Sequence, residues 1–169
     1  MRGLLPRLAS VEVGRRDADP PYLVRSLPSP CVLGAIYWLV GLPSPPTGCC
    51  TTPGMLRFDM HTEEFAGFPS PSCVQQLDDA NGVLAELAGK LCYGHVPDDR
   101  TVQLWIAAAD EWSLQCTVVL CHPFHHVIPF ADDYQGGILF NVDYSVIYRY
   151  DVERGVMERM VGMNNEMTY

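Results

Sequence analysis

The chain has 169 residues, and its 48% apolar content is sufficient for the core of one domain. Its 20 acidic residues outnumber 11 basic ones, giving a net charge of −9. This balance argues against a nucleic-acid surface, which needs clustered Lys and Arg. The longest apolar run, around residues 31–42, is shorter than the ~20 residues of a membrane-spanning helix, and no signal peptide is recognisable. We therefore expect neither a nucleic-acid nor a membrane partner, reduced cysteines, and a cytoplasmic or nuclear location.

The N-terminal residues 1–28 are rich in proline, which cannot donate to a sheet ladder and favours extended, solvated chain. We expect them to form a poorly ordered leader. The folded domain is expected to span residues 29–161. Residues 162–169 show no convincing period and are expected to form a frayed tail.

A short pattern of alternating apolar residues returns along the chain. Leu56–Met60 reappears 92 positions later as Tyr148–Val152, and Val102–Ile106 lies halfway, at a spacing of about 46. Each copy follows an apolar run that contains glycine, beginning at Gly34, Gly89 or Gly136. A period of roughly 40–50 residues built from short strands is typical of propeller blades.

Two of these copies predict a strand, a tight turn and a second strand. Asp59 and Asp151 end the first strand in each case and are expected to hydrogen-bond amides of the turn. The segment from Val83 to Leu91 is ambiguous, because its apolar spacing and propensity favour a helix whereas the repeat and its bracketing glycines favour a strand. We favour the strand, and we also expect a strand over residues 112–120. The predicted fold is therefore all-β: a partial propeller-like array of about three kelch-like β-repeat units behind a disordered leader.

One cluster of possible metal ligands stands out: Cys116, Cys121, His122, His125 and His126. Its spacing departs from the close cysteine pairs of zinc sites, so we predict no metal site there and keep metal binding as an alternative. Cys49-Cys50 carries no evident role. Acidic doublets such as Asp98-Asp99 sit beside turn signals, and no phosphate loop or nucleophile elbow is present. We predict no enzyme activity and no cofactor.

The chain from about Ser29 to Met160 resembles the F-box associated domain of plant F-box proteins, particularly those of grasses. The segments that carry the resemblance are Ser29–Leu39, Leu56–Phe65, Leu87–Cys92, Val102–Ile106, Trp112–Leu114 and Tyr148–Val152. The resemblance implies the substrate-recognition region of an SCF-type ubiquitin ligase receptor, which recruits a target protein. The segment before Ser29 is too short and too rich in proline for the F-box, so docking on the ligase adaptor is not expected.

The predicted function is thus a protein-interaction module with an unknown target protein. Its binding surface is expected in a loop from Cys121 to Gly136 that carries aromatic and ionisable residues, a combination that interfaces favour. The candidate partner-binding residues are His122, His125, His126, Asp132, Asp133 and Tyr134. The alternatives are a metal-binding or metal-dependent β-protein that uses the Cys116–His126 cluster, and a non-functional truncated family member.

Overall fold

A computed structural model of the chain describes residues 24, 29–40, 54–74, 82–132 and 136–162, and these form strands without a helix. The strands are β1 Cys31–Val32, β2 Ala35–Leu39, β3 Met55–Asp59, β4 Glu64–Phe68, β5 Val83–Leu87, β6 Lys90–His95, β7 Thr101–Ala108, β8 Glu111–Val119, β9 Val127–Asp132, β10 Gly137–Val142, β11 Val146–Asp151 and β12 Val156–Gly162. The all-β prediction is confirmed. Within the described ranges, no helix has the length and apolar character needed to cross a bilayer.

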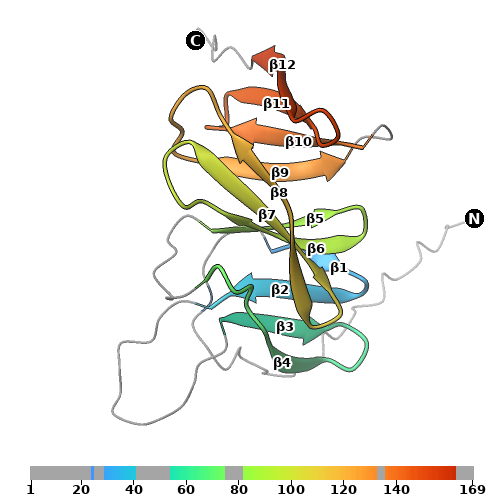
Figure 1. Cartoon of the computed structure of the whole chain (residues 1–169). Coiled ribbons are helices and arrows are strands. Elements are labelled where there is room, and N and C mark those ends of the chain that lie inside the picture. The colour runs from blue at the N-terminus through green and yellow to red at the C-terminus, as the bar shows by residue number, and fades with distance from the viewer. Residues whose placement is uncertain (1–23, 25–28, 41–53, 75–81, 133–135, 163–169) are drawn as a thin grey trace, which may run out of the picture.

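The strands form three antiparallel sheets of four strands each, taken in chain order. We call them sheet 1 (β1–β4), sheet 2 (β5–β8) and sheet 3 (β9–β12). Figure 1 shows sheets 1 and 3 at opposite ends with sheet 2 between them, and β5 lies beside β9. The predicted array of about three propeller-like units is confirmed.

A glycine with positive φ lies directly before the second strand of each sheet. Gly34 has φ 79° after Leu33 at 49°, and Gly89 has φ 74° after Ala88 at 52°. Two successive residues with positive φ match the twist of a two-residue hairpin turn. The turn at Ala88-Gly89 therefore explains why Val83–Leu87 is a strand despite its helical propensity, and the predicted strand is confirmed.

The strand pairing corrects the spacing of the middle repeat. The fourth residue after each turn glycine pairs with Leu56, Trp105 and Tyr148 in turn, so the equivalent positions are 49 and 43 residues apart. The prediction that Val102–Ile106 is equivalent to Leu56–Met60 at 46 residues is therefore wrong by three positions. The connection from β4 to β5 is longer than the connection from β8 to β9, and each turn sets the register of its own sheet.

Aspartates hold the turns between the third and fourth strands of sheets 1 and 3. Asp59 Oδ1 accepts the N–H groups of His61 at 2.9 Å and Thr62 at 3.2 Å, and Asp151 Oδ1 accepts that of Arg154 at 2.9 Å. The predicted turn roles of both aspartates are confirmed. The N–H groups of His61 and Thr62 hold the pKa of Asp59 below its usual value of 3.8, and Arg57 contributes in the same direction.

Each sheet has two faces. We call the face directed toward the preceding sheet in chain order the leading face, and the face directed toward the following sheet the trailing face. The leading face carries the cross-strand pairs Trp38–Leu56, Tyr93–Trp105 and Phe140–Tyr148. The trailing face carries the pairs Tyr37–Arg57, Cys92–Ile106 and Leu139–Arg149. Both cores form where the leading face of one sheet packs on the trailing face of the sheet before it.

The core between sheets 1 and 2 is rich in aromatic rings. Phe68 lies 5.2 Å from Tyr37 and 6.0 Å from Trp112, both edge-on, and Trp112 also contacts Tyr93 at 6.4 Å. The indole N–H of Trp112 donates to the carbonyl of Pro69 at 2.7 Å, which ties β8 to the segment after β4. The core between sheets 2 and 3 is mostly aliphatic and includes Leu104 and the fully buried Phe140.

The structure describes Val24 in the predicted leader and Gly162 in the predicted tail. Val24 pairs with Val40 in an isolated antiparallel bridge, and Gly162 is the last residue of β12. The remainder of both segments, together with Cys49-Cys50, lies outside the described residues. Whether the domain boundaries hold therefore stays a prediction.

Candidate functional site

Three connections between strands meet on one edge of the array, which we call the loop rim. They are residues 96–100 after β6, residues 120–126 after β8 and residues 143–145 after β10. The N–H of Leu120 donates to the carbonyl of Arg100 at 2.8 Å, and that of Phe124 donates to Asp99 at 2.9 Å. Sheets 2 and 3 are thus joined through this rim.

The base of the loop rim is fixed by Asp98. Its Oδ1 accepts the N–H groups of Arg100 and Thr101, each at 2.8 Å. The hydrogen bond from Arg100 is the main reason why the pKa of Asp98 lies below its usual value of 3.8. The doublet Asp98-Asp99 therefore has a turn role.

Asp143 fixes the other side of the rim. It lies in the tight turn between β10 and β11 with φ 51°, and Tyr144 follows at 55°. Its Oδ1 accepts the N–H groups of His125 at 2.8 Å and His126 at 2.7 Å, and its own N–H donates to the carbonyl of His126 at 2.8 Å. These bonds hold the backbone of the 120–126 connection while both imidazoles stay exposed.

Aromatic and apolar side chains support the exposed groups of the rim. The ring of His126 lies 5.5 Å from that of Tyr144, which is 61% exposed. Phe124 is buried in the core between sheets 2 and 3 and anchors the middle of the connection. The rim is therefore a rigid platform on which three histidines and a tyrosine face outward.

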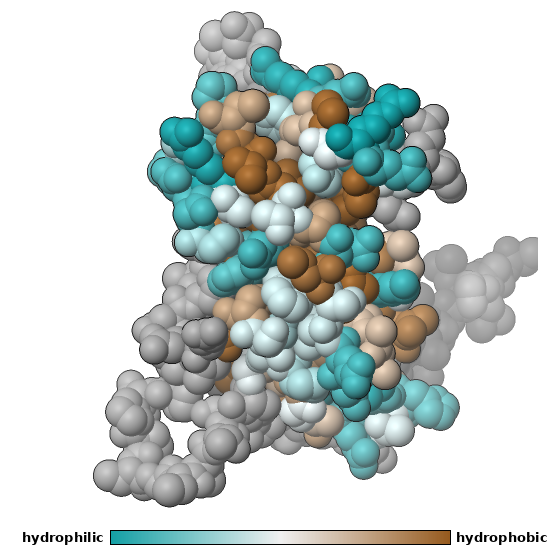
Figure 2. All heavy atoms as spheres, viewed as in Figure 1, coloured by the Kyte–Doolittle hydropathy of each residue, from teal (hydrophilic) through white to brown (hydrophobic). Residues whose placement is uncertain are grey.

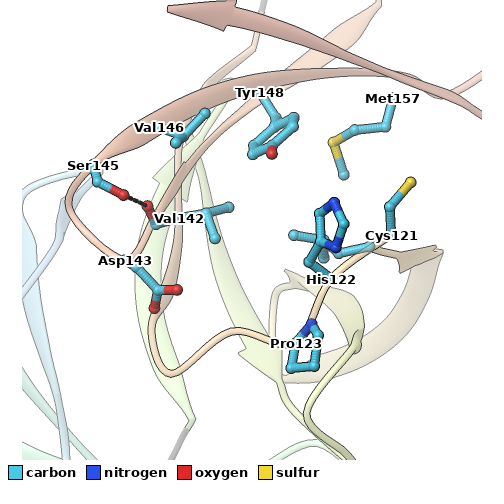
Figure 3. Close-up of a pocket in the computed structure, with 10 residues that line it drawn as sticks. Cys121, His122, Pro123, Val142, Asp143, Ser145, Val146, Tyr148 and Met157 are labelled. Atoms are coloured by element: carbon cyan, nitrogen blue, oxygen red, sulfur yellow. Dashed lines mark hydrogen bonds between the residues drawn. The ribbon is translucent and has the colours of Figure 1, made fainter. Parts of the chain in front are cut away.

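A pocket of about 280 Å³ opens beside this platform. Figure 3 shows His122, Cys121 and Met157 on one side of it, Asp143 and Ser145 on the other, and Tyr148 between the two groups. Leu120, Pro123, Val142 and Val146 complete its lining. An apolar floor with polar groups at the mouth can take a side chain from another protein.

The alternative of a metal site at Cys116–His126 finds no supporting geometry. Among the residues that the structure describes, no three His, Cys, Asp or Glu side chains are placed so that they could hold a metal ion. Cys116 packs against the core between sheets 2 and 3, and burial raises the pKa of its thiol to about 11. A protonated, partly buried thiol is a poor ligand.

The six candidate partner-binding residues do not all lie in one loop. The predicted loop from Cys121 to Gly136 is wrong in its middle, because residues 127–132 form β9. A strand of six residues spans roughly 17–20 Å, so Asp132 lies at the opposite edge from His122, His125 and His126. Asp133 and Tyr134 lie outside the described residues.

Sequence reasoning missed Asp143, Tyr148 and Met157 as part of this site. Asp143-Tyr144 between two apolar runs is a recognisable turn signal. Nothing in the sequence indicates that its carboxylate reaches back 17 and 18 residues to the histidine amides.

Comparison with known proteins gives one informative similarity. No known family model matches the chain. It is 29% identical over 131 residues to the F-box protein At3g57590 of Arabidopsis thaliana. The matched region covers 71% of this chain and 30% of that protein, so the chain spans about a third of the length of the relative.

Proposed function

We propose that the chain is a protein-binding module without catalytic activity of its own, and that the loop rim binds a target protein. The observation that carries the proposal is the fixed 120–126 connection, which exposes His122, His125 and His126 beside a pocket of about 280 Å³. A backbone held by Asp143 loses little conformational entropy on binding.

The similarity to an F-box protein supports the coarser part of the proposal, a role in protein interaction. The resemblance to the F-box associated domain extends it to recruitment of a target for an SCF-type ubiquitin ligase in the cytoplasm or nucleus. Adaptor docking is not part of the proposal, because the similarity covers less than a third of the relative.

Affinity purification from plant extract, read by quantitative mass spectrometry, tests this function. The bait is the tagged chain, compared with His122→Asp/His126→Asp on the loop rim. The control is His61→Asp, in the exposed turn between β3 and β4 on the opposite edge. We expect one protein to be enriched by the wild type and the His61 variant and lost from the rim variant.

Equal recovery by all three baits would contradict the use of this rim. Recovery of the ligase adaptor would show that the chain has a docking surface of its own. Recovery of chaperones alone would favour the non-functional fragment.

A further inference from the structure

The two ends of the array carry faces of the kind that pack together inside it. Sheet 2 covers the trailing face of sheet 1, and sheet 3 covers the trailing face of sheet 2. The leading face of sheet 1 and the trailing face of sheet 3 have no such neighbour among the described residues. They are equivalent to the two sides of the internal interfaces.

The leading face of sheet 1 repeats an interface pattern. Trp38 occupies the position of Tyr93 and Phe140, which are 1% and 0% exposed, whereas Trp38 is only partly buried. Phe65 lies 4.8 Å from Phe58 and 6.3 Å from Trp38. Leu56, which pairs with Trp38 on this face, is fully buried. This face is apolar across three strands, as the covered leading faces are.

The trailing face of sheet 3 carries the matching row. One residue from each of its four strands forms a row of neighbouring pairs: Ile128, Asn141, Ile147 and Val161. Ile147 occupies the position of Met55 and Leu104, which are both 0% exposed, but is itself only partly buried. Val161 is 53% exposed. In Figure 2, apolar atoms reach the surface around sheet 3 in the upper half of the molecule.

We propose that a second copy of this chain covers both faces, with the leading face of sheet 1 in each copy packed on the trailing face of sheet 3 in the other. The contact would continue the internal interfaces, because the two faces are equivalent to faces that already pack together within the chain. Head-to-tail contacts give rings when the rotation closes. Propellers close with roughly four to eight blades, and two copies of the three described sheets fall within that range.

The charged groups of the trailing face are compatible with a buried contact. Arg149 and Asp151 neutralise each other at 4.0 Å, so neither would be an isolated charge.

The test is the solution mass of the 169-residue chain by size exclusion with light scattering over a wide range of concentration. We expect twice 18.8 kDa for the wild type. Trp38→Glu and Ile147→Glu each alter both contacts of the ring, and we expect each to give the mass of one chain. The control Leu33→Glu changes a side chain that is 93% exposed in a turn, and it should stay dimeric.

Mixing the two variants distinguishes head-to-tail packing from other dimers. Trp38→Glu keeps an intact sheet 3 face and Ile147→Glu keeps an intact sheet 1 face, so the mixture regains one of the two contacts. We expect a dimer to reappear only in the mixture. Circular dichroism checks that each variant is folded, and Phe65→Glu at the edge of the same face replaces Trp38→Glu if the latter unfolds.

A monomeric wild type would overturn the proposal and would mean that another part of the chain, or a different protein, covers these faces. A dimer lost in only one of the two variants would also overturn it, because that result indicates like faces packed together. Large open assemblies would exclude the closed ring. The proposal does not depend on the function assigned to the loop rim.

Discussion

At the scale of single residues, short acidic side chains hold the connections between strands. Asp59, Asp98, Asp143 and Asp151 each accept backbone N–H groups close to a turn. These bonds satisfy amides that lie beyond the sheet ladders. Loops on both edges of the array are thus fixed by carboxylates.

The pH dependence of the stability of the fold can be tested at Asp59. Its folded pKa lies below 3.8, so the ionised carboxylate stabilises the fold above pH 3.8, and that stabilisation is lost as the pH falls through the folded pKa. We expect Asp59→Asn to lower Tm at neutral pH and to differ progressively less from the wild type below pH 3.8. Thermal unfolding across this range measures the difference, with the exposed Glu64→Gln as the charge control. A difference in Tm that does not change with pH would refute this role.

The turn roles of Asp59 and Asp151 were predictable from the sequence because both hydrogen bonds are local. The role of Asp143 was not, because its amide partners lie on a different connection. The histidines were recognised in the sequence as candidate binding residues because they are ionisable. The pocket beside them was not, because it is built from three separate segments that only the fold brings together.

At the scale of elements, the turns set the register of each sheet. Residue alternation predicted the strands around Phe58, Trp112 and Tyr150, because half-buried strands repeat every two residues. It did not predict the 49- and 43-residue spacing, since connection lengths vary freely. It also missed β9, where Pro129 and two neighbouring histidines made a strand resemble a loop.

The Ala88-Gly89 turn gives a matched pair of substitutions. Gly89 has φ 74°, and a side chain in this region costs roughly 1–2 kcal/mol. We expect Gly89→Ala to reduce the free energy of unfolding by about 1 kcal/mol. Ala88→Asn should raise it, because Asn tolerates positive φ better than Ala and Asn-Gly is favoured in such turns.

Urea denaturation of both variants measures these changes. Opposite signs are the expected result. A decrease in both variants would contradict the two-residue turn, because it would mean that position 88 does not require a positive φ.

At the scale of the whole molecule, sheet 2 contributes to both cores and joins the array. Leu104 is fully buried between sheets 2 and 3. We expect Leu104→Ala to cost about 2–5 kcal/mol and to increase amide exchange in β6 and β10 together. The control Leu114→Ala changes a residue of the same sheet that is 47% exposed, and it should have a much smaller effect. Faster exchange in β6 alone would show that the sheets open independently.

The central claim is that one edge of this array, the loop rim, binds a target protein. The most direct measurement is hydrogen exchange with mass spectrometry on the chain with and without the protein that it captures. We predict slower exchange in residues 120–126 and 143–145, with no change in the turns at 60–63, 88–89 and 152–155 on the opposite edge. Slower exchange confined to those turns, or to the face that carries Trp38, would contradict it.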